Sequence, residues 1–309
     1  MRIPEAPAWA QTLGRGETFV KQRFGAANRR LPDVIGIGAE KCGTTSLHYY
    51  LKAHPEIGVQ RSKEMRFFVD GAGGRWHRGL DWYVRQFPGD RRTLVESHGG
   101  GYSAYPFRQG VPARIHATIP QARFLYVVRD PIERLISRWV HNYANGDEHR
   151  PLDEALADLD DIEYVPQSRY AFQLEQYLAL FAPSRFLIVD QRDLLSRRHE
   201  TLRAIFRFLA VREDFSSPQF EVIRHPSRIK RRLNPLGAAF DRVVGRRLLD
   251  RLGNSGRHWF KRLVYTPVST RIERPQLDRA LRARLREVFR PDVRRLEEIA
   301  GRRFDGWLA

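Results

Sequence analysis

The residues from Gly38 to Thr45, GAEKCGTT, have the composition of a loop that binds phosphate. Two glycines give the backbone freedom to turn, and threonine hydroxyls with N–H groups at a helix start can donate to an anion. The order resembles the nucleotide-binding pattern G-x-x-x-x-G-K-[ST], but Lys41 lies two residues before Gly43 instead of directly after it. The position of the lysine raises the question of which anion needs a positive charge there. A helix entry that binds no ligand is the alternative interpretation of these residues alone.

A buried strand and an amphipathic helix are predicted to position this loop. Val34 to Gly38 is a short apolar run, and between residues 44 and 52 the apolar residues Leu47, Tyr50 and Leu51 share one helical face. Similar pairs of segments recur along the chain, which is typical of helices packed around a parallel sheet. The predicted fold class is α/β, a P-loop-like three-layer fold with a central parallel sheet flanked by helices.

The other predicted elements follow from the same patterns. The further strands are 93–96, 124–129 and 186–189, and the further helices are 132–143, 170–181, 199–209 and 276–299, the last with an interruption at Pro291. Glycine or basic composition predicts loops at 71–74, 99–101 and 224–232.

The chain has 309 residues, of which 42% are hydrophobic and 29% are charged, as in a folded globular protein. No linker divides it, so we expect one domain over residues 31–309 after an N-terminal extension of residues 1–30. The single cysteine, Cys42, excludes an internal disulfide and a cysteine-cluster metal site. No apolar run approaches the length of about 20 residues that crosses a bilayer, and the first residues lack the apolar core of a secretory signal. We therefore expect a cytoplasmic protein without a transmembrane segment, with peripheral membrane contact left open.

The formal net charge is +18, with only six lysines among 54 basic residues. The arginines are scattered through predicted helices beside acidic neighbours, which argues against a dedicated nucleic-acid surface. Small anionic ligands explain the arginines better, because a guanidinium matches phosphate and sulfate oxygens.

The loop Gly-x-x-Lys-x-Gly-Thr-Thr after a strand resembles that of the sulfotransferases that use 3′-phosphoadenosine 5′-phosphosulfate (PAPS). The resemblance runs from about residue 33 to the C-terminus and is strongest to the branch that acts on heparan and other sugars. It implies that the loop binds the 5′-phosphate of PAPS and that Lys41 reaches the bridging oxygen, where it stabilises the leaving group. It implies no metal. The donor-binding residues expected in this loop are Lys41, Cys42, Gly43, Thr44, Thr45 and Ser46.

Further segments resemble the same family in the same order. Lys63-Glu64-Met65-Arg66-Phe67-Phe68 resembles a K-E-x-x-F-F segment and implies that Glu64 is the catalytic base; its alternative is an exposed acid paired with a lysine. The run from Val127 to Ser137 resembles V-x-R-D-P-x-x-R-x-x-S, which implies that Arg129 and Ser137 bind the 3′-phosphate of the donor.

Two further positions are predicted to contact the donor. Tyr170 resembles a tyrosine that contacts adenine, with core packing as an almost equal alternative. The stretch 224–232 occupies the place of the family's basic loop, so Arg228 and Lys230 are candidate 3′-phosphate contacts, although its usual glycine-rich form is absent and a solvated loop is the alternative.

The segment after the strand at 93–96 departs from the carbohydrate branch, which continues with K-[ST]-P. This chain has Glu96-Ser97-His98, so the lysine and the proline are missing. The branch that acts on phenols and steroids has K-[ST]-H with the histidine as base, which makes His98 a second candidate base. We favour Glu64, and the two residues can also cooperate.

The predicted reaction is in-line transfer of a sulfuryl group from PAPS to a hydroxyl of an acceptor. The acceptor is expected to be a bacterial carbohydrate or glycolipid, with a small aromatic or lipid alcohol left open. Aromatic residues between the motifs either stack on sugar rings or fill core; they are Trp76, Trp82, Tyr83 and Tyr102. The alternatives are a P-loop kinase or NTPase, and a non-catalytic protein that binds nucleotide or nucleic acid. Oligomeric state is not predicted.

Overall fold

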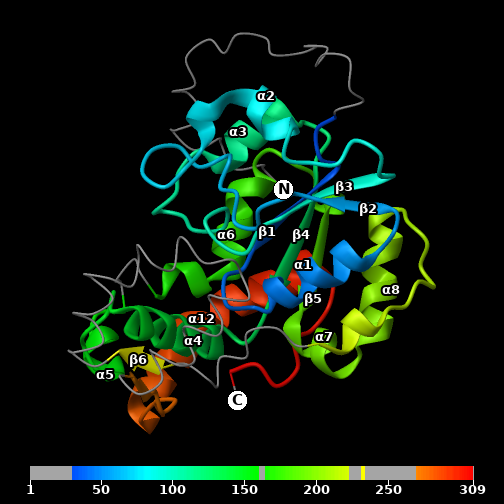
Figure 1. Ribbon diagram of the computed structural model, residues 1–309. Helices are drawn as coiled ribbons and strands as arrows, with labels where there is room; N and C mark the ends of the chain where they lie inside the picture. Colours follow the sequence, from blue (N-terminus) through cyan, green and yellow to red (C-terminus); the bar gives the residue numbers. More distant parts are fainter. Residues whose placement is uncertain (1–29, 160–163, 223–230, 234–268, 309) are drawn as a thin grey trace, which may run out of the picture.

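The computed structural model describes residues 30–159, 164–222, 231–233 and 269–308 of the chain. Figure 1 shows a central sheet with helices packed on both sides of it. The elements in chain order are β1 (Val34–Gly38), α1 (Thr44–Ala53), β2 (Ile57–Val59), η2 (Trp76–Arg78), α2 (Gly79–Val84), β3 (Thr93–Ser97), α3 (Val111–Thr118), β4 (Arg123–Val128), α4 (Pro131–Asn145), α5 (Leu152–Ala155), η3 (Pro166–Ser168), α6 (Tyr170–Leu178), η4 (Pro183–Arg185), β5 (Phe186–Asp190), α7 (Gln191–Ser196), α8 (Arg198–Leu209), η5 (Pro218–Glu221), β6 (Arg231–Leu233), β7 (Ser269–Arg271) and α12 (Arg279–Ala300).

The main sheet has five parallel strands in the order β2-β3-β1-β4-β5. Val34 of β1 is in register with Val95 of β3 on one side and with Arg123 of β4 on the other. The chain first builds the sheet on the β3 side and then crosses to the β4 side, so the strand order reverses at β1. Ligands of open α/β sheets bind at the carboxyl ends of strands at such a reversal. The topology thus directs attention to the end of β1, and it confirms the predicted α/β class.

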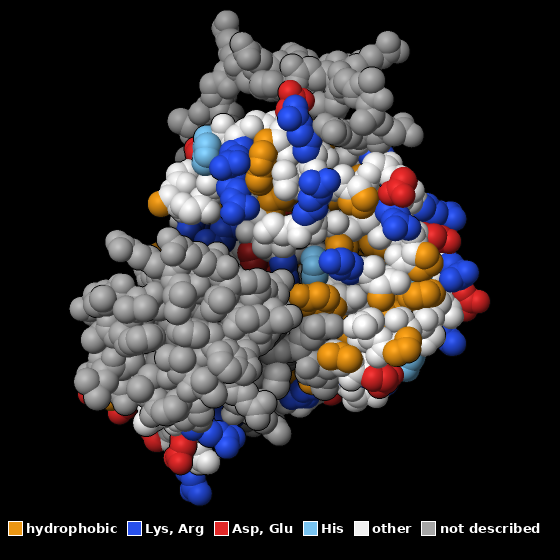
Figure 2. Space-filling model, in the orientation of Figure 1, with side chains coloured by type: hydrophobic (Ala, Val, Ile, Leu, Met, Phe, Trp, Pro, Cys, Tyr) orange, Lys and Arg blue, Asp and Glu red, His pale blue; other side chains and the backbone are white. Residues whose placement is uncertain are grey.

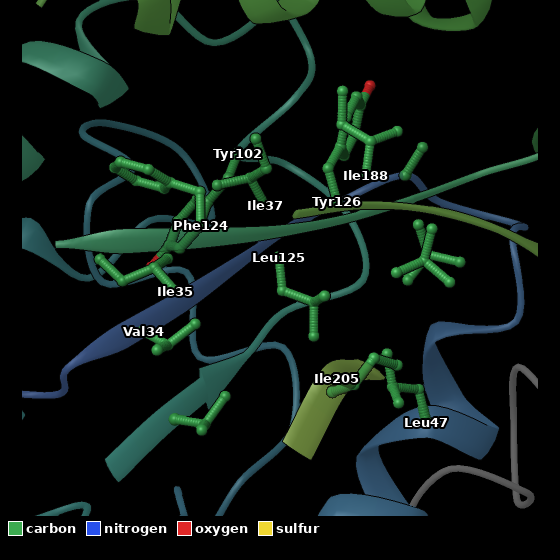
Figure 3. Close-up of a cluster of buried hydrophobic side chains, with 14 of the residues drawn as sticks. Val34, Ile35, Ile37, Leu47, Tyr102, Phe124, Leu125, Tyr126, Ile188 and Ile205 are labelled. Carbon is green, nitrogen blue, oxygen red and sulfur yellow. The ribbon is translucent and has the colours of Figure 1, made fainter. Parts of the chain in front are cut away.

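Both faces of the sheet are covered because alternate strand residues point to opposite sides. Leu125 points toward Leu47 of α1 and Ile205 of α8, whereas Phe124 and Tyr126 point to the other side (Figure 3). On that second side the Phe124 ring lies 5.4 Å from the ring of Tyr177 in α6. Strands buried on both faces have near-continuous apolar sequences, which is why VIGIG and RFLYVV form the central strands.

Gly36 of β1 allows an unusually close approach of the neighbouring strand end. A Cβ on this glycine would lie 3.2 Å from the His98 nitrogen and 3.3 Å from the Glu96 carbonyl oxygen. Both distances are tighter than ordinary van der Waals contact, so a side chain here would push β3 away from β1. The glycine therefore keeps the end of β3 beside the loop that follows β1.

Most predicted elements are confirmed with shifts of one to three residues at their ends, and two expectations were wrong. Pro291 does not interrupt α12, which continues to Ala300. Buried residues on both sides of the proline, including Phe289 and Val293, hold this helix against the core and outweigh the one lost backbone hydrogen bond. In the predicted loop 224–232, residues 231 and 232 belong to β6, which pairs antiparallel with β7.

Several short elements were missed altogether, including β2, α2, α3, α5 and α7. Each has between three and eight residues, which is too few to show a clear periodic pattern in the sequence. Within the described parts of the chain, no helix combines the length and the apolar character that crossing a membrane requires.

The start of α4 is fixed by Asp130, which follows β4 directly. Its carboxylate accepts a hydrogen bond from the Glu133 nitrogen at 2.9 Å and another from the Leu308 nitrogen at 2.7 Å. Pro131 occupies the first helical position, where its missing N–H removes no intrahelical hydrogen bond. The Asp130 side chain therefore caps α4 and also binds the backbone at Leu308.

We expect Asp130→Ala to lower the free energy of unfolding by about 1–2 kcal/mol, because the change removes a helix cap. Asp130→Asn retains an oxygen acceptor and should lose less. Urea unfolding followed by circular dichroism measures both.

Asp90→Ala is the matched control, since its carboxylate is exposed and forms only a 3.8 Å ion pair with Arg91. It should change stability by less than about 0.5 kcal/mol. Equal effects of Asp130→Ala and Asp90→Ala would contradict a capping role for Asp130.

Candidate functional site

The loop between β1 and α1 has the backbone of an anion-binding turn. Lys41 has a φ of 69° and Gly43 a φ of 86°, so both lie in the left-handed region. Gly43 is the N-cap of α1, no side chain caps the helix, and its first turn holds no acidic residue. The first turn of α1 therefore offers its N–H groups and positive dipole end without an acidic side chain of its own to compete for them. The sequence prediction of a phosphate-type loop followed by a helix is confirmed in its geometry.

Arginines that follow β4 hold this loop from the side. Arg129 Nη1 donates to the Lys41 carbonyl oxygen at 3.2 Å, and the fully buried Arg134 donates through Nε to the Glu40 carbonyl oxygen at 3.3 Å. Arg138 Nη1 lies 2.7 Å from Glu40 Oε1. Burial acts to raise the pKa of Glu40, but Arg138, Arg134 and Lys41 outweigh it and lower that pKa. The loop thus rests on an ionised glutamate enclosed by cations.

Sequence reasoning identified Arg129 but missed Arg134 and Arg138. Arg129 and Arg134 lie in the segment that resembled a phosphate-binding element, and Arg138 follows it directly. The sequence does not show which of these arginines supports the loop and which contacts a ligand. Arg129 also approaches Glu133 Oε2 at 3.3 Å. Ser137 is buried on α4, and no hydrogen bond within the described residues uses its hydroxyl. The 3′-phosphate role of Arg129 and Ser137 remains a prediction.

Cys42 and Tyr170 meet beneath the loop. The Tyr170 hydroxyl lies 3.6 Å from the Cys42 sulfur, and its fully buried ring packs near Tyr126 and Trp307. Burial raises the pKa of the Cys42 thiol to about 11, so the thiol is neutral at physiological pH. Tyr170 therefore supports the loop through core packing, and its predicted contact with adenine stays a prediction. The predicted residues Arg228 and Lys230 lie outside the described part of the chain.

Glu64 lies in an irregular segment with a left-handed backbone. Its φ is 61°, a conformation that costs a non-glycine residue about 1–2 kcal/mol and therefore needs support from its surroundings. The carboxylate supplies that support: Oε2 accepts from the nitrogens of Gly99 at 3.3 Å and Gly100 at 3.2 Å, and Oε1 pairs with Lys63. Burial works to raise the pKa of Glu64, but the Lys63 ammonium and the hydrogen bonds from Lys63 and Gly99 lower that pKa. Glu64 is thus ionised at neutral pH, with 37% of its side chain exposed.

His98 lies against Glu64 with its side chain fully buried. Its Nδ1 is 3.2 Å from Glu64 Oε2 and accepts a hydrogen bond from the Gly100 nitrogen at 3.0 Å. Burial lowers the pKa of His98 to about 4, so the ring is neutral at physiological pH. Nε2 is buried and has no partner among the described residues. Of the two candidate bases, Glu64 is therefore the one with an exposed reactive atom.

Gly99 brings the two candidate bases to the phosphate-type loop. A Cβ built on it would lie closest to Glu64 Oε1 and 2.8 Å from both Lys63 Nζ and Thr44 Oγ1. The carboxylate of Glu64 and the first hydroxyl of α1 thus converge on the space that a side chain at this position would need. A Cβ built on Gly100 would similarly lie 3.2 Å from the Cβ of Glu40. The glycine segment 99–101 is a close junction between three parts of the site.

Two buried titratable side chains near Glu64 were missed by sequence reasoning. Glu96 of β3 is fully buried and accepts hydrogen bonds from the hydroxyls of Tyr83 and Tyr102, the latter at 2.7 Å. Burial raises the pKa of Glu96 to about 7. His48 of α1 has a buried, unpartnered Nδ1, and burial lowers its pKa to about 4. The signal for Glu96 was a lone acid inside the apolar run TLVES.

Arginines gather on the surface around α2, beside the Glu64 segment (Figure 2). Arg66 Nη1 and Arg108 Nη2 lie 3.5 and 3.9 Å from a Cβ built on Gly73, and Arg66 Nε lies 4.0 Å from one on Gly101. Neither guanidinium forms an ion pair within the described residues. A cationic surface thus extends away from His98 and Glu64.

The four aromatic residues between the motifs divide into two groups. Tyr83 and Tyr102 are buried and fill core, whereas Trp76 and Trp82 are half-buried. The guanidinium of Arg78 lies 5.2 Å from the centre of the Trp82 ring. Only the tryptophans are placed to contact a ligand. Among the residues that the structure describes, no group of three or more histidine, cysteine, aspartate or glutamate side chains is arranged to hold a metal.

Comparisons with known proteins agree with this geometry. The chain is 27% identical over 202 residues to the human bifunctional heparan sulfate N-deacetylase/N-sulfotransferase 2, an alignment that covers 59% of this chain and 22% of that protein. The Drosophila melanogaster bifunctional heparan sulfate N-deacetylase/N-sulfotransferase is 27% identical over 216 residues, with 59% and 20% covered. The chain therefore spans about a fifth of the length of the curated relatives it matches.

The fold is also shared with a solved structure. The sulfotransferase from Alicyclobacillus acidocaldarius superimposes with a TM-score of 0.64 at 23% identity, over 91% of this chain and 100% of that one. The profile of the sulfotransferase domain matches residues 31–227, the part that contains β1 with its loop, Glu64, His98 and Arg129. The chain belongs to the sulfotransferase domain family.

Proposed function

We propose that this chain transfers a sulfuryl group from PAPS to a hydroxyl of an acceptor, by in-line displacement. The observation that carries the proposal is the position of an ionised carboxylate beside the phosphate-type loop, with Glu64 Oε1 and Thr44 Oγ1 both close to the position that a Cβ on Gly99 would occupy. A transfer enzyme needs this arrangement, because the group that accepts the proton must lie close to the site where the leaving group is stabilised. Family membership supports the proposal.

The residues around the α1 start fit the anionic end of the donor. An uncapped helix N-terminus without an acidic first turn favours a phosphate, and the charge of Lys41 lies within the loop itself. Arg129 and Ser137 would hold the 3′-phosphate, and Tyr170 would lie near the base. The loop residues assigned to the 5′-phosphosulfate are Lys41, Cys42, Gly43, Thr44, Thr45 and Ser46.

The donor supplies a sulfuryl group attached to a phosphate that leaves readily. The acceptor oxygen bonds to sulfur while the bond from sulfur to the phosphate oxygen breaks, and Glu64 takes the hydroxyl proton. Lys41 and the N–H groups of α1 stabilise the charge that the departing phosphate gains. Glu64 is ionised before the reaction because Lys63 and two glycine N–H groups stabilise its charge.

His98 positions Glu64 in this proposal. Its neutral Nδ1 lies 3.2 Å from Glu64 Oε2, so the captured proton can be shared between the two groups after transfer. Its buried side chain prevents direct contact with a large acceptor.

We propose a carbohydrate or glycolipid acceptor that carries its own negative charge and is modified in the cytoplasm. Arg66 and Arg108 lack acidic partners among the described residues, so an anionic group of the acceptor could form ion pairs with their guanidinium groups. Half-buried Trp76 and Trp82 on the same side can stack on a sugar ring. Heparan sulfate, which the names of the relatives contain, is an anionic sugar chain. Because those names specify N-sulfotransferases, amino sugars belong beside hydroxyl sugars in an acceptor screen.

Calorimetric titration with adenosine 3′,5′-bisphosphate tests the donor site. We expect tight binding, at least a tenfold loss in Arg129→Ala, which corresponds to about 1.4 kcal/mol, and a smaller loss in Lys41→Ala. Lys41→Ala should instead lose most of the transfer rate, since its charge is needed as the leaving group departs.

Arg207→Ala is the matched control for these variants, because Arg207 of α8 pairs with Glu213, outside the proposed site. It should bind like the wild type. A preference for ATP, with ATP-dependent transfer, would favour a kinase or NTPase. Binding of nucleic acid with steep salt dependence and no transfer would favour a non-catalytic binding protein.

Gly99→Ala tests the junction between the base and the loop. The methyl group would displace the flexible ends of Glu64, Lys63 and Thr44, so we expect kcat to fall at least tenfold with little change in melting temperature. Stopped assays with labelled PAPS measure kcat.

Gly301→Ala is the control, because Gly301 has a left-handed φ of 61° and open space around its Cβ position. It should lose about 1 kcal/mol of stability and keep the wild-type kcat. A wild-type kcat in Gly99→Ala would show that the junction does not need this glycine.

Arg66→Gln tests the charge of the acceptor. We expect KM for a carboxylated or sulfated oligosaccharide to rise about tenfold, equivalent to about 1.4 kcal/mol, while KM for PAPS stays unchanged. The effect should shrink at high salt because the interaction is exposed. Arg207→Gln provides the control, and equal KM changes for neutral and anionic oligosaccharides would contradict an anionic acceptor.

A further inference from the structure

Glu96 occupies a place in the core where a carboxylate is costly. It lies on β3 with no exposed surface, and its two oxygens accept hydrogen bonds from two tyrosines that come from different segments. Tyr83 belongs to α2, and Tyr102 follows the glycine segment 99–101. No cation forms an ion pair with Glu96 within the described residues. A buried acid held only by hydroxyl groups needs a reason beyond stability.

The first chain of contacts runs from Glu96 through Tyr102 to the base. The Tyr102 hydroxyl donates to Glu96 Oε1 at 2.7 Å and accepts from the Phe68 nitrogen at 3.2 Å. The Tyr102 ring stacks on the His98 ring, with ring centres 4.1 Å apart and an angle of 29° between the planes. His98 in turn lies 3.2 Å from Glu64. Glu96 thus fixes the ring against which His98 rests.

The second chain of contacts runs from Glu96 through Tyr83 to the segment that carries Glu64. Tyr83 donates to Glu96 Oε2, and its ring stacks on Phe67 with centres 4.1 Å apart and an angle of 11°. Phe67 is fully buried and lies three residues after Glu64. Because Glu64 and Arg66 both have left-handed backbones, the segment needs such external contacts to keep its shape.

We propose that Glu96 is a positioning residue for sulfuryl transfer, which fixes Glu64 from two sides through Tyr102 with His98 and through Tyr83 with Phe67. The inference rests on the proposed function. Glu96 contacts neither the phosphate-type loop nor the surface, so it acts on the base and leaves donor binding unchanged. Its two acceptor oxygens join α2 to the segment that follows the glycines.

The charge of Glu96 links this positioning to pH. The titratable groups that face it are Tyr83, Tyr102, Tyr177 and Glu64. Burial raises the pKa of Glu96 to about 7, whereas Glu64 and His98 titrate well below neutrality. Only the ionised carboxylate accepts from both hydroxyls at once, so the arrangement seen in the structure belongs to the ionised form. Because this form positions Glu64, kcat should rise with pH through about 7.

Glu96→Gln is the first test, measured with adenosine 3′,5′-bisphosphate binding and with a pH profile of kcat. The amide keeps the size of the side chain but forces one tyrosine hydroxyl to reverse its hydrogen bond. We expect the bisphosphate Kd and the KM for PAPS to stay within twofold, kcat at pH 8 to fall about tenfold or more, and the rise near pH 7 to disappear.

Tyr83→Phe and Tyr102→Phe separate the two chains of contacts and keep the test open if Glu96→Gln does not fold. Each change removes one hydroxyl and keeps the stacked ring, so each should lower kcat by a smaller factor than Glu96→Gln. Combining either change with Glu96→Gln should not lower kcat further than Glu96→Gln alone. Tyr164→Phe is the matched control, because its buried hydroxyl also donates to a carboxylate, that of Glu148, at 2.9 Å. It should keep the wild-type kcat.

The outcomes separate this inference from the proposed function. If the wild type transfers sulfate and Glu96→Gln has the wild-type kcat, the positioning role alone is overturned. The same holds if kcat of Glu96→Gln still rises near pH 7. A wild type that neither binds the bisphosphate nor transfers sulfate would overturn the proposed function, and the positioning role with it.

Discussion

The hydrogen bonds from the Gly99 and Gly100 nitrogens to Glu64 are the interaction on which the site depends. They join the carboxyl end of β3 to the irregular segment that carries the carboxylate, and they do so beside the first turn of α1. The approach is possible because neither glycine has a side chain and because Gly36 lets β3 lie close to β1. Backbone geometry, more than any one charge, therefore sets the distance between base and loop.

Electrostatics then resolves a conflict that this geometry creates. A carboxylate and a site for a phosphorylated donor lie side by side, and like charges repel. Lys63, two N–H groups and the neutral His98 surround Glu64, while Lys41 and the positive end of α1 belong to the loop. Glu40, which would oppose a donor anion, is neutralised by Arg138 and Arg134. Glu64 and Glu40 thus each have their own positive partners.

How much the sequence predicted depends on how local each feature is. β1, its loop and α1 were predicted almost to the residue, because a strand, a glycine turn and a helix are encoded in consecutive residues. The sequence left two interpretations of Tyr170 open, adenine contact and core packing. A helical pattern does not show whether an aromatic side chain packs in the core or lines a ligand site. The Glu96 network was missed for a similar reason: Tyr83 and Tyr102 come from separate segments that only the folded sheet brings together.

The hydrogen bond from Leu308 to Asp130 has a consequence for the order of assembly during synthesis. The two residues are 178 positions apart, and Trp307 makes a similar contact with Asp190 at the end of β5. Asp130 is synthesised long before Leu308, so the start of α4, directly after Arg129, lacks this contact until 178 further residues have been added. A nascent chain therefore contains the α1 loop well before the part of the site that follows β4 has all of its contacts.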